Sequence, residues 1–303
     1  MIAVELENVS KTFGTVRAVD NLSLQVPQGS IYGFIGPNGS GKTTTLRMIM
    51  NIFYPDCGVI RVLGREVVGA RTVDVGYLPE ERGLYKRMKV RTLLRFYGEL
   101  KCGRNVNTEV DAWLDRLELG EWGNKKVEAL SKGMSQKVQF IAAVVTRPKL
   151  AILDEPFSGL DPVNADALRD AMLELRRQGT TIILSTHDMG IAERMCDFIF
   201  MIFKGRKVLD GTLAAIQNQY GSDTIRVRTS EGMAALRGIA GVANINDHGQ
   251  MQELHMERGS NSQQILAALM ARTRVESFEL TKPSLHDIFV RIAGPQAREV
   301  NRA

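Results

Sequence analysis

Apolar and polar positions alternate over short distances in the first third of the chain, and this period of two predicts β-strands. Three runs share β-branched residues and flanking turn-forming segments: VELENV (4–9), NLSLQV (21–26) and SIYGFIG (30–36). GVIRVLGREV (58–67) predicts a further hairpin-like unit. TTTLRMIMNIF (43–53) instead has helical apolar spacing directly after a Gly-rich turn, and Pro55 is expected to end that helix.

The middle of the chain is dominated by apolar positions with a 3.6-residue period, which predicts a helical insert over about 88–146. KLAILDE (149–155) and TTIILSTH (180–187) follow as buried strands, with a helix over VNADALRDAMLELRRQ (163–178) between them. The order strand, helix, strand implies parallel pairing. The expected fold class is therefore α/β.

The character of the sequence changes after DGT (210–212), where a polar, strand-poor region without a nucleotide motif begins. We expect one domain over 1–218, a linker near 218–223 and a small α+β domain over 223–303. A chain of 303 residues is long enough for this division.

Composition and charge narrow the class of protein only coarsely. Hydrophobic residues make up 44% and charged residues 24% of the chain, which is ordinary for a globular protein. The longest apolar runs, such as FIAAVV (140–145), are too short to span a bilayer, and the N-terminus has no secretory pattern, so we expect a cytoplasmic location. The three cysteines are expected to be reduced thiols. The net charge of +5 is compatible with nucleic acid, anionic headgroups or phosphate as partner.

The string GPNGSGKTT (36–44) fits G-x-x-x-x-G-K-[ST] between a predicted strand and a predicted helix, which indicates a P-loop. Glycines let backbone N–H groups turn toward phosphate oxygens, while Lys42 would reach the β and γ phosphates and Thr43 would hold Mg²⁺. The alternative is a flexible glycine turn before a helix, but the strand–loop–helix context favours ATP or GTP binding. The predicted nucleotide contacts in this loop are Gly36, Pro37, Asn38, Gly39, Ser40, Gly41, Lys42, Thr43 and Thr44.

Two acidic residues, Asp154 and Glu155, close a predicted buried strand, at the sheet edge where α/β proteins bind ligands. Asp154 would meet Mg²⁺ through water, and Glu155 is the candidate base for the attacking water; the alternative is a helix cap. His187 closes the next strand and should reach the same edge, although a lone His is more often structural. Phe13 could stack on adenine or could equally be a core residue.

Together these motifs resemble the ATP-binding subunit of an ABC transporter over about residues 2–215. The P-loop string, LAILDE, SGLD (158–161) and STHD (185–188) stand in the family's order, and ALSKGMSQK (129–137) falls at its LSGGQ signature. The resemblance implies a P-loop ABC-type ATPase with an antiparallel β subdomain, a parallel core sheet and a helical insert. It also implies ATP and Mg²⁺ as cofactors.

The resemblance further implies partners. Two such domains, in a homodimer or with a paralogous subunit, pair head to tail, so that Ser131 and Gly133 donate to ATP held by the other chain, and Asp161 of SGLD joins the site. Integral membrane permease subunits bind the pair, which would place the chain at the inner face of the cell membrane. Lys132 replaces the signature's usual first Gly, and whether it contacts ATP or faces solvent is open.

A second departure lies in GYLPEERGLY (76–85), which resembles the loop that contacts the membrane subunit. The family usually has Gln where this chain has Glu80, which places a carboxylate near Mg²⁺ and the attacking water and makes Glu80 a catalytic and metal candidate. YLPEERGLY and SLHDIFVRIAG (284–294) resemble bacterial sodium or drug exporter subunits with a small C-terminal domain.

Three functions can be compared by how well they account for these residues. The favoured one is a transport ATPase, for which no nucleic-acid partner is expected. The alternative is a soluble ABC ATPase that acts on nucleic acid or ribosomes, and the basic charge keeps it open. A small-molecule P-loop kinase would leave SKGM and SGLD unexplained.

Overall fold

The computed structural model describes residues 1–67, 73–81, 83–220, 224–257 and 259–300. The chain forms two compact units, Met1–Gly211 and Thr212–Ala303. The boundary expected at 218 falls inside helix α7 (Leu213–Tyr220), which belongs to the second unit. Residues 221–223 of the expected linker lie outside the described residues.

Hydrogen bonds explain why α7 belongs to the second unit. The Nε2 atom of Gln217 donates to the carbonyl oxygen of Pro283 at 3.0 Å. Lys282 Nζ donates to Asn218 Oδ1 at 2.8 Å. Helix α7 therefore joins the C-terminal part of the chain through polar side chains at its C-terminal end, in addition to its buried Ile216.

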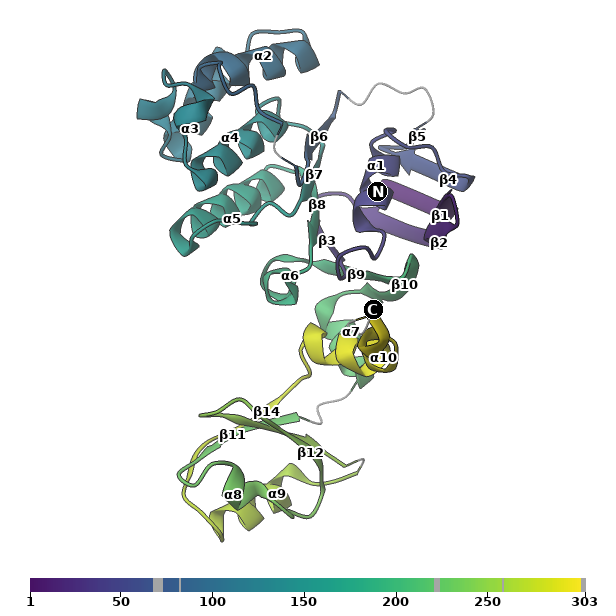
Figure 1. Cartoon of the computed structure of the whole chain (residues 1–303), viewed down its shortest axis with the longest axis vertical. Helices are drawn as coiled ribbons and strands as arrows, with labels where there is room; N and C mark the ends of the chain where they lie inside the picture. Colours follow the sequence, from purple (N-terminus) through teal and green to yellow (C-terminus); the bar gives the residue numbers. More distant parts are fainter. Residues whose placement is uncertain (68–72, 82, 221–223, 258, 301–303) are drawn as a thin grey trace. The chain divides into compact units, whose positions relative to one another are not determined.

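A six-stranded sheet forms the centre of the first unit (Figure 1). Neighbouring strands are parallel except for the edge pair β9 and β10, which is antiparallel. Across the sheet the order is β10 (Arg206–Gly211), β9 (Phe198–Phe203), β3 (Ile31–Ile35), β8 (Thr181–Thr186), β7 (Leu150–Asp154) and β6 (Val75–Leu78). This is the parallel core sheet predicted from the strand–helix–strand order.

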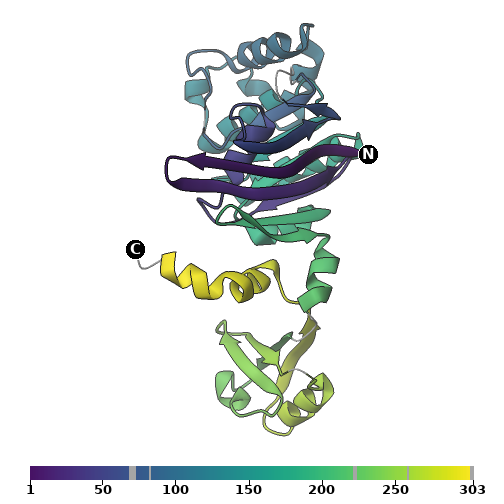
Figure 2. The ribbon, with the colours of Figure 1, turned by 90° about the vertical axis from the view of Figure 1, so that its right-hand side faces the viewer.

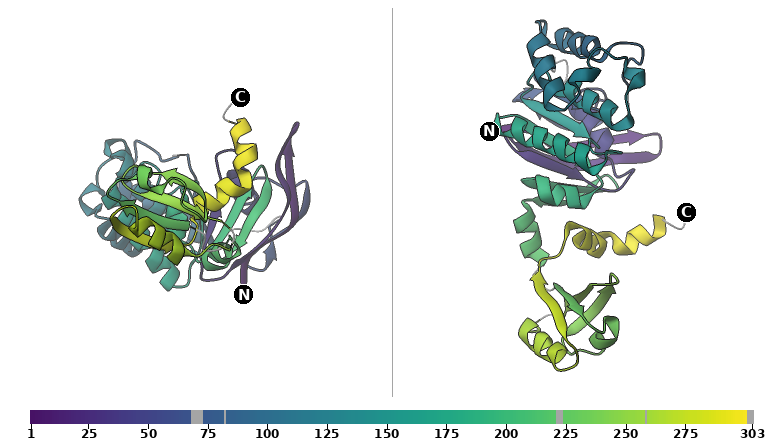
Figure 3. Two further views of the ribbon diagram at one scale, coloured as in Figure 1. Left: turned by 90° about the horizontal axis from the view of Figure 1, so that it is seen from below. Right: turned by 90° about the vertical axis from the view of Figure 1, so that its left-hand side faces the viewer.

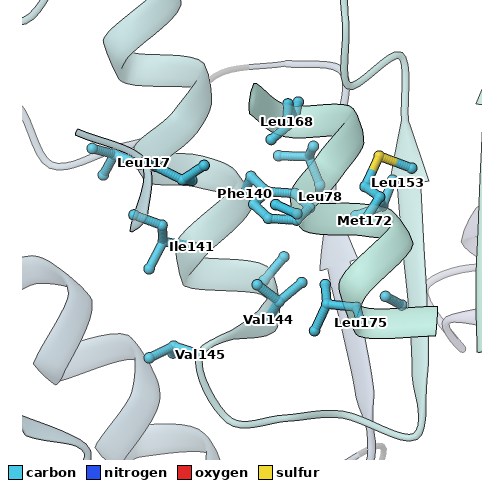
Figure 4. Packing of buried hydrophobic residues seen from close by; sticks show 14 of the residues in the cluster. Leu78, Leu117, Phe140, Ile141, Val144, Val145, Leu153, Leu168, Met172 and Leu175 are labelled. Carbon is cyan, nitrogen blue, oxygen red and sulfur yellow. The ribbon is translucent and has the colours of Figure 1, made fainter. Parts of the chain in front are cut away.

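Both faces of this sheet are covered, as a parallel sheet requires. Along β7, Leu150 and Ile152 join one hydrophobic cluster, whereas Ala151 and Leu153 join the other. Figure 4 shows part of the cluster that contains Leu153; Phe140 of α4 (Lys132–Val144) and Leu168, Met172 and Leu175 of α5 (Pro162–Arg177) belong to the same cluster. A strand buried on both faces reads as a continuous apolar run, which is the pattern seen in LAIL.

The other face packs on helix α1 (Lys42–Ile49) and a four-stranded antiparallel sheet. That sheet has the order β2 (Val16–Pro27), β1 (Ile2–Phe13), β4 (Cys57–Val62) and β5 (Arg65–Glu66), and Figure 2 shows its long β1–β2 hairpin. Helix α1 was expected to reach Pro55 but ends at Ile49. Asn51 has a φ of 58°, a left-handed conformation that stops the helix before the proline.

The helical insert lies on one side of the unit (Figure 3). It contains α2 (Val90–Cys102), α3 (Asn107–Arg116), the short 3₁₀ turns η1 (Gly120–Trp122) and η2 (Val127–Ala129), and α4. The helices α2, α3 and α4 contact one another, as their apolar periods predicted. The helix α6 (Met189–Met195) follows β8 and leads back to β9.

The second unit holds a complete sheet, so the prediction of a strand-poor region was wrong. Its elements are β11 (Thr224–Thr229), α8 (Met233–Leu236), β12 (Val242–Asp247), β13 (Gln252–Met256), α9 (Ser262–Met270), β14 (Val275–Thr281) and α10 (Leu285–Val300). The strand order β12-β13-β11-β14 and the chain order give a split βαβ topology with α8 and α9 on one face (Figure 1). The unit is α+β, as expected.

Charge pairs on the other face explain why these strands were missed. The Nε atom of Arg226 lies 2.9 Å from Glu253 Oε1, and that of Arg228 lies 3.2 Å from Glu276 Oε2. Pairs of this kind give the strands a polar composition.

No helix among the described residues is both long and apolar enough to cross a membrane.

Candidate functional site

The loop between β3 and α1 passes so close to its neighbours that only glycine fits at two positions. A Cβ on Gly36 would lie 2.2 Å from the carbonyl oxygen of Ile202, and one on Gly41 would lie 2.4 Å from that of Ala18. Gly41 also has a φ of 109° and caps α1 without a side-chain hydrogen bond. The first N–H groups of α1 therefore remain free of a side-chain cap, which suits an anion at this helix start.

Lys42 points back into the loop rather than toward solvent. Its Nζ donates to the carbonyl oxygen of Gly36 at 2.6 Å and to that of Pro37 at 3.2 Å, and the residue is 6% exposed. Burial lowers the pKa of the Lys42 amine, and the negative charges of Glu155 and Asp154 oppose this shift. An ammonium has three donors, so one remains for a ligand in the loop.

The loop forms one wall of a cleft of about 620 Å³. The cleft is lined by Val16, Arg17, Ala18, Asn38, Gly39, Ser40, Gly41, Lys42, Thr43, Thr44, Glu80, Asp154, Glu155, Lys204 and Gly205. The structure thus brings together the predicted loop residues from 38 to 44, Glu80 and both acids. Gly36 and Pro37 do not line the cleft. Their carbonyl oxygens accept hydrogen bonds from Lys42, which does.

Phe13 is not among the lining residues. Its ring packs edge-on against Phe53, with centroids 5.4 Å apart, and it is 42% exposed. Val16, at the start of β2, lines the cleft beside the P-loop and was not predicted, because no motif marks an exposed valine in a hairpin. Lys204 was missed for the same reason: it reaches the cleft only because β9 lies beside β3.

Thr43 and Asp154 meet where β3 and β7 end. The Oγ1 atom of Thr43 donates to Asp154 Oδ2 at 3.2 Å. Asp154 is 1% exposed, its Oδ1 has no hydrogen-bond partner among the described residues, and burial raises its pKa. A buried carboxylate oxygen without a partner fits a cation beside Thr43.

Thr43 and Asp154 are too few ligands to enclose a metal ion by themselves. Among the described residues, no group of three or more His, Cys, Asp or Glu side chains is placed to hold one. Mg²⁺ is commonly bound by one or two carboxylates together with substrate phosphates and water. The pair of Thr43 and Asp154 next to the P-loop therefore fits Mg²⁺ that arrives with a nucleotide.

Glu155 and His187 are in direct contact at the same edge. The Oε1 atom of Glu155 lies 2.7 Å from Nδ1 of His187 and accepts the His187 backbone N–H at 2.9 Å. The hydroxyl of Thr186 donates to the other oxygen, Oε2, at 3.3 Å. Glu155 is 9% exposed and has a φ of 50°, so an unusual backbone conformation turns its side chain toward the cleft.

Three further predicted residues lie away from this cleft in the single chain. Ser131 caps α4, where its Oγ accepts the backbone N–H of Met134 at 3.2 Å, and Gly133 follows in the first turn. Asp161 caps α5 by accepting the N–H of Asn164 at 3.0 Å. None of the three lines the cleft, so within one chain the structure does not bring them to the P-loop.

Comparisons with known proteins agree with this geometry. The family model described as "ABC transporter" matches residues 19–158, and the one described as "ATP-binding protein DrrA1-3-like, C-terminal domain" matches 211–293. The ABC transporter ATP-binding protein YhaQ of Bacillus subtilis is 40% identical over 291 residues, which are 95% of this chain and 98% of YhaQ.

Two further relatives extend the likeness. The daunorubicin resistance ATP-binding protein DrrA3 of Streptomyces coeruleorubidus is 30% identical over 307 residues, which cover 98% of this chain and 97% of DrrA3. A solved ATP-binding subunit of an ABC transporter has a TM-score of 0.68 at 31% identity and covers 73% of this chain and 94% of that one. The chain therefore belongs to the family of ABC transporter ATP-binding proteins, whose members hydrolyse ATP to power transport.

Proposed function

We propose that this chain is the ATP-hydrolysing motor of an ABC exporter, and that it closes as a dimer on ATP to drive separate membrane permease subunits. The observation that carries the proposal is the meeting of Thr43, Asp154 and Glu155 in the P-loop cleft, with His187 in contact with Glu155 although it does not line the cleft itself. Export is proposed because DrrA3 is named for drug resistance.

The P-loop binds and orients the triphosphate. The free N–H groups at the start of α1 face the phosphates, and Lys42 places its remaining donor on them. Thr43 and Asp154 would hold Mg²⁺ beside the phosphate oxygens. When bound, Mg²⁺ supplies positive charge that neutralises the developing charge on the transferred phosphoryl group.

Glu155 takes the proton of the attacking water on its carboxylate. Hydrogen bonds from Thr186 and from the backbone N–H of His187 hold this carboxylate in one orientation. The imidazole of His187 is 2.7 Å away and its side chain is 59% exposed, so the ring borders both the base and the open side of the site. We assign the general base to Glu155 and the role of orienting it to His187.

Ser131, Gly133 and Asp161 act, in this proposal, in the cleft of a second chain. The Ser131 hydroxyl accepts a hydrogen bond from Met134, so its own proton remains available to a phosphate oxygen. Helix α4 has 13 residues and no acidic residue in its first turn, so its N-terminus carries positive potential. The second chain is a further copy of this protein or a paralogous subunit.

An apolar cleft of about 610 Å³ between the helical insert and the core supports a permease as partner. Tyr77, Pro79 and Leu84, from the segment that resembles the membrane-contacting loop, line it together with Tyr97 and Leu100 of α2. Leu100 is 74% exposed, and the contacting rings of Tyr85 and Phe96 are 57% and 44% exposed, so several large apolar side chains lie open on this part of the chain. Binding there would place the chain at the inner face of the cell membrane.

The nucleic-acid alternative has little physical support. The split βαβ topology of the second unit is shared with RNA-binding domains, which stack bases on aromatic side chains of the open sheet face. Here the only Phe, Tyr or Trp on the described strands of that sheet, Phe278, packs into the hydrophobic cluster under the helices. The open face instead carries pairs such as Arg226 with Glu253.

Turnover of Mg-ATP by the purified full chain tests the proposal. We expect activity that is lost in Lys42→Ala and retained in Lys149→Ala, whose surface lysine is 70% exposed and pairs with Asp74. Single-stranded RNA and DNA should not stimulate the rate. A chain that binds Mg-ATP but hydrolyses it only when nucleic acid is present would contradict the proposal.

A further inference from the structure

Two segments of the helical insert that are far apart in the sequence, 86–90 and 125–128, lie side by side in the structure. Three backbone hydrogen bonds of 3.0 Å join them. The side chains of Val90 and Val127 are buried and belong to the hydrophobic cluster of the insert, so each segment is anchored on the core. The two segments therefore hold their exposed side chains on one shared surface.

Lysines face one another across this pair. Lys89 and Lys126 occupy opposed positions in an antiparallel bridge, where like charges are destabilising. The Nζ atom of Lys126 lies 3.3 Å from Oε1 of Glu128, but these side chains are 59% and 49% exposed, so the ion pair contributes little. The arrangement thus departs from what would stabilise the pairing, and such departures are expected where a protein binds a partner.

Three further cations, Lys86, Arg87 and Lys125, belong to the same two segments. All three are exposed, and among the described residues no ion pair involves them or Lys89. Together the segments hold five cations and one acid, Glu128. A local excess of positive charge of this kind attracts an anionic partner.

Exposed aromatic rings continue the surface. Tyr85 directly precedes the first segment and is 57% exposed, and Phe96 of α2 is 44% exposed. Their rings meet edge-on with centroids 6.4 Å apart. Exposed aromatic rings beside Lys and Arg are typical of a membrane interface, where the rings lie at the level of the headgroups and the long cationic side chains reach the phosphates.

We propose that Tyr85, Phe96 and the five cations form a surface, the basic–aromatic patch, that binds the anionic headgroups of a phospholipid bilayer. The contact is made by this chain itself and needs neither a permease nor a nucleotide. It goes beyond the proposed function, in which the permease holds the chain at the membrane. None of these residues lines the P-loop cleft, so the patch is separate from the nucleotide site.

A bilayer fits the basic–aromatic patch better than a nucleic acid does. Bases stack on open ring faces, but Tyr97 stacks on Tyr85 with centroids 6.1 Å apart, and Phe96 meets Tyr85 edge-on. A bilayer requires only that rings and cations are exposed together, and its anionic surface attracts each cation without a defined pairing geometry.

Sedimentation of the full chain with phospholipid vesicles tests the proposal. We expect binding to vesicles of equal parts phosphatidylcholine and phosphatidylglycerol, weakened by added KCl, and little binding to phosphatidylcholine alone. The patch variant, which combines Lys86→Gln, Lys89→Gln and Lys126→Gln, should bind the mixed vesicles about tenfold or more weakly, because each cation near an anionic surface contributes about fivefold. Neither nucleotide nor permease is present, so failure of the proposed function would leave this result unaffected.

The matched control removes three exposed lysines elsewhere, through Lys149→Gln, Lys207→Gln and Lys282→Gln. Both variants lower the formal net charge of +5 by the same amount. The control should bind the mixed vesicles as the parent does, and the patch variant should keep the parental Tm and turnover of Mg-ATP, since its altered residues are exposed and lie outside the P-loop cleft. Equal loss of binding in both variants would assign the effect to net charge and overturn the proposal, as would parental binding by a folded patch variant.

A single substitution tests the aromatic part of the surface. Tyr85→Ser should weaken binding to the mixed vesicles several-fold, whereas Tyr54→Ser, which alters an equally exposed tyrosine outside the patch, should not. Equal affinities in these two variants would overturn the role of the ring. Single-stranded RNA that binds the parent and not the patch variant, while vesicles bind both equally, would show that the partner is a nucleic acid instead.

Discussion

The Nδ1 atom of His187 lies 2.7 Å from Oε1 of Glu155, although the two residues are separated by the whole of α5 and β8. Their meeting follows from topology: β7 and β8 are parallel neighbours, so the residues directly after them arrive at the same edge of the sheet. This contact leaves the carboxylate of Glu155 with its orientation fixed by three donors or possible donors. A base held in this way needs little reorganisation when water attacks.

Glu155→Gln preserves the size of the side chain and removes its basicity. We expect ATP binding to remain nearly intact, turnover to fall about a hundredfold or more, the range for loss of a general base, and a nucleotide-bound dimer to accumulate. Binding titrations, steady-state turnover and size-exclusion chromatography with Mg-ATP measure the three effects. Turnover at the parental rate under saturating Mg-ATP would show that another group is the base.

Ser131 is expected to act in trans, because it does not line the P-loop cleft of its own chain. Mixing Ser131→Arg with Lys42→Ala should give a dimer in which one cleft is assembled from two intact halves while the other carries both substitutions. Because only one of the two clefts is intact, we expect turnover to recover to at most about half of the parental rate per dimer. Each variant alone serves as the control, and absence of recovery in a mixed dimer shown to form would exclude a shared site.

Local patterns predicted the P-loop and the strand ends because the chemistry there depends on neighbours in sequence. The glycines, Lys42 and Thr43 belong to one loop and one helix start, and Asp154 with Glu155 directly follow a buried run. Parallel pairing then places His187. These inferences needed only the order of the elements and the rule that parallel strands end at a common edge.

Features that depend on contacts between distant segments were not predicted. Val16 lines the cleft only because the β1–β2 hairpin passes beside Gly41, and Phe13 turns onto Phe53 instead. The strands of the second unit carry cross-strand charge pairs, such as Arg226 with Glu253, that hide the alternation of apolar residues. Helix α1 ends early because Asn51 adopts a left-handed conformation. Residue propensities did not predict this conformation, and the proline four residues later was expected to end the helix instead.

The second unit is expected to be dispensable for ATP binding. All residues that line the P-loop cleft lie between Val16 and Gly205, within the first unit. The structure places the cut after Gly211, before α7, and not inside that helix. A chain ending at Gly211 should bind Mg-ATP within about threefold of the full chain, a change below about 1 kcal/mol. Fluorescent-nucleotide titration and thermal unfolding check this, and a folded product without binding would contradict it.

Glu80 brings a third carboxylate to the cleft where the family usually has an amide. It is exposed, lines the cleft, and its charge opposes the pKa shift of Lys42 and adds to that of Asp154. A further negative charge beside Asp154 and Glu155 favours a divalent cation and disfavours the triphosphate in the absence of one. Glu80 should therefore make nucleotide use more dependent on Mg²⁺ than an amide would.

We expect Glu80→Gln to raise the Mg²⁺ concentration for half-maximal turnover about threefold to tenfold, the effect of losing one charge interaction of roughly 1 kcal/mol in a solvent-exposed cleft. Binding of ATP without Mg²⁺ should become tighter, because the substitution removes a repulsive charge. The matched control is Glu81→Gln, a neighbour that is also exposed but does not line the cleft, for which the Mg²⁺ curve should stay at the parental position. Turnover is measured against Mg²⁺ at fixed ATP for the three chains. Coincident curves for the parent and Glu80→Gln would show that Glu80 is a solvated loop residue with no influence on the metal, whereas a shift shared by both variants would assign the effect to net charge rather than to position.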